Sequence, residues 1–169
     1  ISAGIGRGQL KVLEDRVEKK RHIFDAYKKC LADIEEISFI DEMENERANF
    51  WLSVMLIDSE SVTPTMVMEA LAKKNIETRP IWKPMHMQPM YRMHEVVGRQ
   101  GTLRCRTNAY IAGGVEDVGA DIFARGVCLP SDNKMTVEEQ DRILGSSFGL
   151  FYLAVLRGRI VRTFSHCPH

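Results

Sequence analysis

The feature that most constrains the fold is an amphipathic segment at residues 8–34, where apolar residues recur at steps of three and four. The apolar positions are Leu10, Leu13, Val17, Phe24, Tyr27, Leu31 and Ile34. This period predicts one long helix with a single buried stripe. A coiled-coil strand is the weaker alternative, because the heptad repeat is not sustained.

Short apolar segments and helical patterns alternate along the rest of the chain. Residues 50–57 are almost wholly apolar and too short to span a membrane, which predicts a buried strand. Further strands are expected at 76–81 and 126–130, and helices at 65–74, 115–125 and from Thr136. Residues 92–114 lack periodicity and predict an extended loop. Three short strands packed against helices make an α/β sandwich over residues 1–144.

Composition excludes several classes of protein. The 169 residues are 44% hydrophobic and 27% charged, with a formal net charge of zero, so no bulk basic field attracts nucleic acid. The four cysteines lie far apart without a C-x-x-C pair, which argues against zinc and favours reduced thiols and a cytoplasmic location. Ile1 is not an initiator methionine and the sequence starts in a helical pattern, so we expect a fragment.

The composition changes abruptly at Gly145. Beyond it, the apolar run FGLFYLAVL precedes a basic segment whose charges are Arg157, Arg159 and Arg162. The run is far shorter than the roughly 20 residues of a transmembrane helix. We therefore expect two parts, residues 1–144 and a divergent tail of 145–169, and no membrane partner. A core-packed continuation, a non-native reading frame and a membrane-surface anchor remain open for the tail.

The densest functional signal is the sequence RPIWKPMH at residues 79–86. Prolines stiffen this loop, so its side chains are held at low entropic cost. Arg79 and Lys83 suit a phosphate. Trp82 can stack on a base or a sugar, and His86 can donate a hydrogen bond. The alternative is a solvated loop whose tryptophan packs into the core.

Two further groups of residues carry weaker signals. The glycines of GIGRG at residues 4–8 fit close helix packing better than a nucleotide loop, but Arg7 among them calls for an anionic partner. Arg99, Arg104 and Arg106 near Tyr110 suit an exposed charged loop better than an RNA or diphosphate site. Cys128, in an apolar strand, is expected to be a buried structural thiol.

Three segments in order resemble the DegT/DnrJ/StrS-type sugar aminotransferases. They are ISAGIGRGQLKVLEDRVEKKRHIFDAYKKCL, RPIWKPMHMQPMY and GVCLPSDNKMTVEEQDRI, and together they span residues 1–144. The resemblance implies the C-terminal small domain of a fold-type-I transferase, with a short, mostly antiparallel sheet packed against helices.

The same resemblance implies an activity. Family members use pyridoxal 5'-phosphate to pass an amino group from glutamate to a nucleotide-linked keto sugar, usually as homodimers, and this sequence is similar to members acting in surface polysaccharide synthesis. The resemblance also implies candidate contacts to the sugar nucleotide at the matching positions of this sequence, which are Arg7, Trp82, Lys83 and His86.

The resemblance also implies what the chain lacks. The family's cofactor lysine and the aspartate that holds the pyridine nitrogen would lie upstream of Ile1, so we expect the fragment itself to be inactive, with no catalytic residue of its own. A sugar dehydratase of the same fold, with histidine in place of that lysine, stays open. A non-catalytic binding module is the alternative from another class.

Overall fold

The computed structural model describes residues 1–91, 94–98, 101–104 and 117–158, and its core is a four-stranded antiparallel sheet. The strands β1 (Ile37–Phe39), β2 (Ser53–Ile57), β6 (Gly126–Leu129) and β3 (Arg79–Pro80) lie side by side in that order. Every neighbouring pair in this sheet is antiparallel. The expected α/β architecture with a short antiparallel sheet is therefore confirmed.

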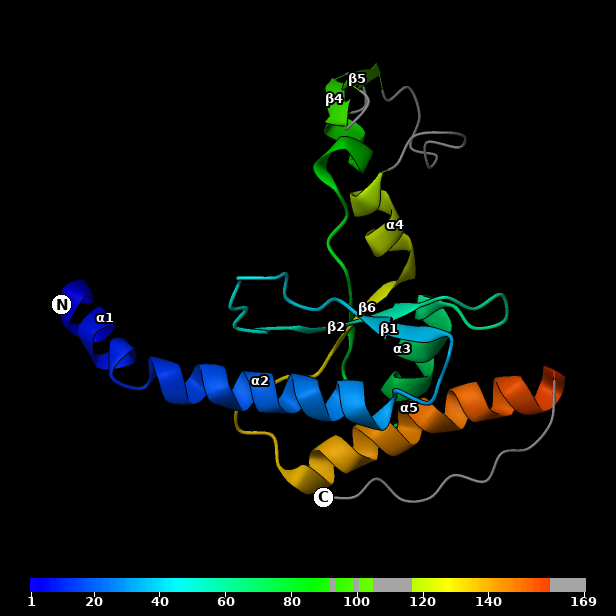
Figure 1. The fold of residues 1–169 in the computed structure, drawn as a ribbon, viewed down its shortest axis with the longest axis horizontal. Coiled ribbons are helices and arrows are strands. Elements are labelled where there is room, and N and C mark those ends of the chain that lie inside the picture. The colour runs from blue at the N-terminus through cyan, green and yellow to red at the C-terminus, as the bar shows by residue number, and fades with distance from the viewer. Residues whose placement is uncertain (92–93, 99–100, 105–116, 159–169) are drawn as a thin grey trace.

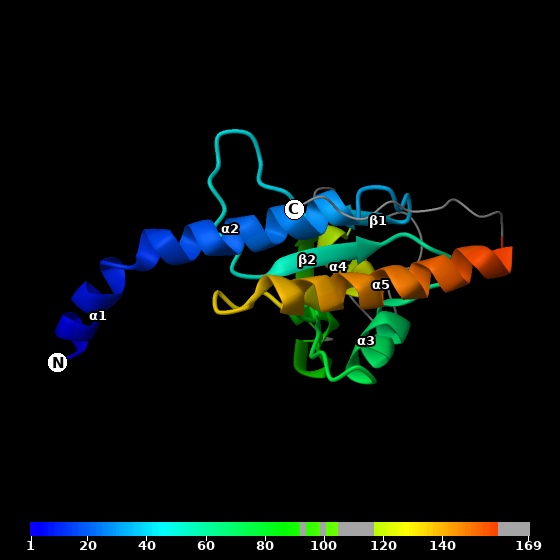
Figure 2. The ribbon, with the colours of Figure 1, turned by 90° about the horizontal axis from the view of Figure 1, so that it is seen from below.

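One face of the sheet packs against three helices, α2 (Leu13–Cys30), α3 (Pro64–Ala72) and α5 (Val137–Gly158). Figure 2 shows α2 and α5 running along the sheet, with α3 beside α5. Met55 pairs with Val127 in the β2–β6 register, so both side chains point to the same face. The shared core contains Ile23, Tyr27, Leu31, Ile34, Met55, Ile57, Val62, Val67, Leu71, Ile76, Val127, Leu129, Ile143 and Leu144. Burial of this apolar surface is the main stabilising contribution.

The predicted N-terminal helix is two helices in the structure. α1 (Ser2–Leu10) ends before α2 begins, and α1 extends away from the sheet (Figure 1). The predicted stripe is correspondingly split, because Tyr27 and Leu31 are buried whereas Leu10 and Leu13 are 68% and 50% exposed. Periodicity reports which side of a helix is apolar, but not whether another element covers it.

Local signals placed most other elements correctly. Thr63 caps α3 by accepting a hydrogen bond from Met66 N, and Asn75, which follows this helix, adopts left-handed geometry with φ of 57°. The predicted helix from Thr136 begins with a capping box, in which the side chains of Thr136 and Glu139 each accept a hydrogen bond from the other residue's backbone N–H. Cys128 is buried in β6 as expected, and its burial raises the pKa of the thiol.

Several boundaries differ from the prediction. β2 begins three residues late because Phe50 has a φ of 41°, and β3 is reduced to two residues. The expected loop at 92–114 contains a hairpin, β4 (Glu95–Gly98) with β5 (Gly101–Arg104), and α4 (Val118–Arg125) runs directly into β6. Cys30 is disulfide-bonded, contrary to the expectation of reduced thiols.

The last helix does not stop at the expected change of composition. α5 continues through residue 145, and Ser146 and Ser147 are buried with hydroxyls that donate to the carbonyls of Arg142 and Ile143 at 2.6 and 2.9 Å. No helix in the described part of the chain is long and apolar enough to cross a membrane. The separate tail at 145–169 stays a prediction, and Arg159 and Arg162 lie outside the described residues.

Gly126 provides a test of the packing between α4 and β6. A Cβ there would lie 2.4 Å from Ile81 Cγ1 and 2.5 Å from the Ile122 carbonyl oxygen, whereas a Cβ on Gly145 in α5 would meet nothing within 4 Å. We expect Gly126→Ala to lower the free energy of unfolding by about 1–3 kcal/mol, as overpacking does. Gly145→Ala should instead raise it by about 0.5–1 kcal/mol through helix propensity. Urea unfolding followed by circular dichroism measures both; equal effects would contradict the packing described for Gly126.

Candidate functional site

The loop that follows β3 carries three of the four predicted site residues. It continues from Pro80 through Trp82, Lys83 and Pro84 into the 3₁₀ turn η1 (Met85–Met87), whose last residue, Met87, is buried. The turn and its buried methionine anchor one end of the loop, and β3 anchors the other. A second 3₁₀ turn, η2 (Pro89–Tyr91), leads on to the hairpin.

His86 is held by a carboxylate from a distant segment. Its Nε2 lies 2.6 Å from Asp117 Oδ2, and both side chains are more than four-fifths buried. Asp117 is also the N-cap of α4, because its other oxygen accepts from Ala120 N at 3.0 Å. One carboxylate therefore begins the helix and fixes the imidazole orientation. Nδ1 is left as the ring atom available to a ligand among the described contacts.

Trp82 does not pack into the core. Its ring stacks on Trp51, with centroids 5.6 Å apart and planes inclined by 23°, and the two residues remain 63% and 61% exposed. The core-packed alternative for Trp82 is therefore wrong. Lys83, next in sequence, is exposed and has no acidic partner within the described residues.

Trp51 is positioned through its backbone. Its carbonyl accepts from Lys20 Nζ at 3.3 Å and from Ser131 Oγ at 2.9 Å, and its N–H donates to Asn49 Oδ1 at 3.1 Å. Lys20 Nζ also donates to the carbonyl of Ser131. Burial lowers the pKa of Lys20, and the nearby carboxylate of Asp132 opposes this shift. The ammonium thus joins α2, the start of β2 and the segment after β6.

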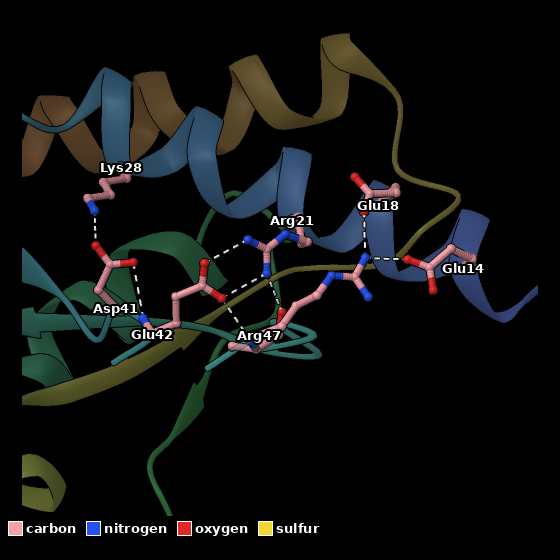
Figure 3. A network of polar contacts seen from close by, with 8 residues as sticks. Glu14, Glu18, Arg21, Lys28, Asp41, Glu42 and Arg47 are labelled. Carbon is pink, nitrogen blue, oxygen red and sulfur yellow. Dashed lines mark hydrogen bonds and ion pairs between the residues drawn. The ribbon is translucent and has the colours of Figure 1, made fainter. Parts of the chain in front are cut away.

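An ionic network fixes the segment that precedes Trp51 (Figure 3). Arg21 on α2 binds both oxygens of Glu42 at 2.8 and 3.0 Å, and its guanidinium lies 5.2 Å from the ring centroid of Phe50. Phe50 stacks in turn on the buried Phe24, with centroids 3.9 Å apart. Two further groups of ion pairs, drawn in the same view, link α2 to this segment: Lys28 with Asp41, and Arg47 with Glu14 and Glu18.

Arg7, the fourth predicted residue, is not brought to this loop. It lies exposed on α1, and both ribbon views place α1 apart from the loop of residues 81–87. Within the described chain, Arg7 therefore forms no common site with Trp82, Lys83 and His86. The second basic cluster cannot be compared, because Arg99, Arg106 and Tyr110 lie outside the described residues.

Two residues of the arrangement were not singled out from the sequence. The helix predicted at 115–125 places Asp117 in its interior, although the spacing from Asp117 to Ala120 fits an N-cap. The strand predicted at 50–57 includes Trp51, and no local signal indicates that the strand starts at Ser53. The contacts of both residues span 31 positions in sequence, from Asp117 to His86 and from Trp51 to Trp82.

A separate cavity of about 540 Å³ lies between the β3 edge of the sheet and α5. Its charged lining is balanced, with three cations and three anions: Arg79, Lys134, Arg142, Glu77, Asp132 and Glu139. Arg79 is itself paired with Glu77 at 2.5 Å. The cavity therefore offers no strong field for an anionic ligand.

The described residues do not form a cofactor or metal site by themselves. Within them, no three His, Cys, Asp or Glu side chains are grouped to hold a metal ion. A pyridoxal phosphate would need a lysine set apart by burial and available to its aldehyde. Eight of the nine lysines are exposed, and the amine of Lys20 is engaged by oxygens of Trp51 and Ser131. The residues present therefore do not fit that cofactor without additional groups.

Comparison with known proteins finds one family. The model of the DegT/DnrJ/EryC1/StrS aminotransferase family matches residues 1–147. A putative pyridoxal phosphate-dependent aminotransferase, EpsN of Bacillus subtilis, is 36% identical over 152 residues, which cover 90% of this chain and 36% of the relative. A GDP-perosamine synthase of Escherichia coli O157:H7 is 33% identical over 91 residues, 54% of this chain and 24% of the relative.

A solved structure shares the fold. The aminotransferase TlmJ from Streptoalloteichus hindustanus superposes with a TM-score of 0.67 at 16% identity, covering 89% of this chain and 36% of that one. The chain spans 36% of the length of EpsN and of TlmJ, and its match to the GDP-perosamine synthase covers 24% of that protein.

The ionic network makes a pH-dependent contribution to stability. The Arg21 guanidinium and the Ala48 N–H hold the pKa of Glu42 at about 2, below its ordinary value of 4.5. The contribution is therefore full above about pH 4.5 and is lost as the pH falls toward 2. We expect Glu42→Gln to flatten the fall of unfolding free energy over this window in urea titrations. Glu44→Gln, at an exposed position in the same segment, is the matched control, and equal flattening by both would refute the assignment.

Proposed function

This chain belongs to the DegT/DnrJ/EryC1/StrS aminotransferase family, and from that premise we propose that it is the sugar-recognising part of a pyridoxal phosphate-dependent transaminase. The proposed reaction moves an amino group from glutamate to a nucleotide-linked keto sugar, in surface polysaccharide synthesis in the cytoplasm. Because the chain spans about a third of its relatives, the activity is proposed for a longer protein that contains it.

The observation that carries this proposal is the loop of residues 81–87. It presents the oriented imidazole of His86, the exposed indole of Trp82 and the ammonium of Lys83. These groups match, in turn, a sugar hydroxyl or carbonyl, a ring face, and a phosphate. One relative is a GDP-perosamine synthase, and the compound in its name is a sugar linked to GDP. This relative supports a nucleotide-linked sugar as the class of substrate.

The cofactor belongs to the proposal for the longer protein. Pyridoxal phosphate supplies the electron sink of transamination, while the protein supplies binding, orientation and charge. The described residues contribute orientation: the Asp117 carboxylate fixes the His86 ring, and the prolines fix the loop that carries Trp82 and Lys83.

Arg7 enters the proposal through assembly. It lies apart from the loop within this chain, so a role at the sugar nucleotide requires that α1 meets the site of a second subunit or residues outside this chain. The proposed homodimer, with sites shared between subunits, provides such an arrangement. The exposed side chains of Ile5 and Leu10 on α1 are compatible with a covered position in that assembly.

The roles of His86 and Arg7 are tested in the complete open reading frame that encodes this chain. With glutamate and a nucleotide-linked 4-keto sugar as substrates, His86→Ala should raise KM for the sugar nucleotide about tenfold, the loss of about 1.4 kcal/mol of binding. KM for glutamate should change less. Arg7→Ala should likewise raise KM for the sugar nucleotide more than KM for glutamate. His22→Ala, at an exposed histidine on α2, is the control. Equal increases for both substrates would remove His86 and Arg7 from the sugar site.

The absence of a cofactor site in this chain alone is tested by mixing the 169-residue chain with pyridoxal phosphate. Eight lysines share an exposed environment, so borohydride reduction should leave at most scattered, substoichiometric labelling. Peptide mass mapping measures which lysines are labelled, and absorbance near the internal-aldimine band measures how much Schiff base forms. Stoichiometric labelling of one lysine would show that the chain holds the cofactor without help.

A further inference from the structure

We propose that Trp51 and Trp82 form a single stacking platform for the base of a nucleoside diphosphate, and that Lys20 is a positioning residue for Trp51. This inference rests on the proposed function and names the part of the substrate that this surface binds. Trp51 is the new element, because its position before β2 gives no sign of a binding role until its contact with Trp82 is seen.

The two indoles, from segments 31 residues apart, form an offset stack in which each ring faces the other and leaves its outer face to a ligand. Their rings are stacked with 23° between planes, and each residue keeps more than half of its surface exposed. Planar bases stack on aromatic side chains with little dependence on sequence, because every base presents a π-face. The outer ring surfaces therefore suit a nucleobase.

The platform is preorganised. Three hydrogen bonds hold the Trp51 backbone, one each from Lys20 and Ser131 to its carbonyl and one from its N–H to Asn49. Trp82 lies in a short loop in which Pro80 and Pro84 have fixed φ angles, and the loop is held at its ends by the pairing of β3 with β6 and by the buried Met87. A surface that is already ordered loses less entropy when a ligand binds.

The charge beside the platform favours a nucleotide over an uncharged aromatic ligand. Lys83 directly follows Trp82, and no acidic partner neutralises it within the described chain, whereas the neighbouring Arg79 is paired with Glu77. An ammonium next to a stacked base meets the phosphates of a nucleoside diphosphate. His86 lies on the same loop. The tryptophans therefore match the base, Lys83 matches the diphosphate, and His86 matches the sugar.

A contact between protein subunits is the competing use of these tryptophans. An aromatic side chain presents at most about 250 Å², so two residues at 61% and 63% exposure offer roughly 300 Å². A stable protein interface needs about 800 Å² on each partner. The platform is therefore better matched in size to a small ligand.

The chain contains two tryptophans, so its indole fluorescence reports on this platform alone. Excited at 295 nm, the 169-residue chain should show saturable quenching on titration with UDP, GDP or TDP, and little with inorganic pyrophosphate at equal ionic strength. Trp51→Ala, read through Trp82, should weaken nucleotide binding at least tenfold, and Trp82→Ala, read through Trp51, should do the same. Met43→Ala, an exposed apolar residue in the same segment, should leave binding unchanged.

The positioning role of Lys20 has its own readout. Stacked indoles couple in far-ultraviolet circular dichroism, so Lys20→Met should diminish the exciton signal of the pair and weaken nucleotide binding. Lys19→Met, the exposed neighbour on α2, should change neither. An unchanged exciton signal in Lys20→Met would overturn the positioning role.

The platform is wrong if pyrophosphate quenches the fluorescence as much as nucleotides do, or if Trp51→Ala leaves nucleotide binding unchanged. It is also wrong if sedimentation shows that the chain self-associates, that Trp51→Ala abolishes this self-association, and that nucleotides have no effect on it. Failure of the proposed function is seen separately, in the complete protein. If that protein transaminates a nucleotide-linked keto sugar with an unchanged KM in Trp51→Ala, the platform is wrong and the function stands. If it does not transaminate although nucleotides quench the platform, the function is wrong and the base site stands.

Discussion

The packing of α2 against the sheet is the contact that positions the segment before β2, which carries Trp51. Tyr27 is fully buried on one face of this helix, and its hydroxyl donates to the carbonyl of Pro130 at 2.8 Å, beyond the end of β6. Burial raises the pKa of this phenol, so the group remains neutral and hydrogen-bonded throughout the ordinary pH range. The same helix carries Lys20 and Arg21, which bind the chain before β2. One helix thus joins the core to the segment that ends in Trp51.

The candidate site depends on two contacts distant in sequence, made by different kinds of chemistry. The pair of His86 and Asp117 is polar and largely buried, so its geometry is fixed by hydrogen bonds and by the N-terminus of α4. The pair of Trp51 and Trp82 is aromatic and exposed, so its geometry is fixed through the backbone. Both converge on the short loop after β3. The site is consequently built by a frame of β3, α4 and the start of β2 rather than by one motif.

The fold was predictable from the sequence where local interactions decide it. The capping box at Thr136, the cap at Thr63 and the left-handed Asn75 each depend on a few neighbouring residues, and all three are present. The predictions failed at three places that the hydrophobic pattern does not mark. They are the break between α1 and α2, the start of β2 after the left-handed Phe50, and the hairpin of β4 and β5. Of the candidate site, the sequence indicated the loop at 81–87 but not its partners Asp117 and Trp51.

The sequence by itself determined the family resemblance, the α/β alternation and the residue types of the loop, because caps, prolines and hydrophobic periods act over a few positions. Only the tertiary structure decided that His86 meets Asp117, that Trp82 lies on Trp51 instead of in the core, and that Arg7 lies apart from them. The physical reason is that each of these relations depends on the packing of α2 and α4 against one sheet. That packing brings together segments far apart in the chain, and no local pattern encodes it.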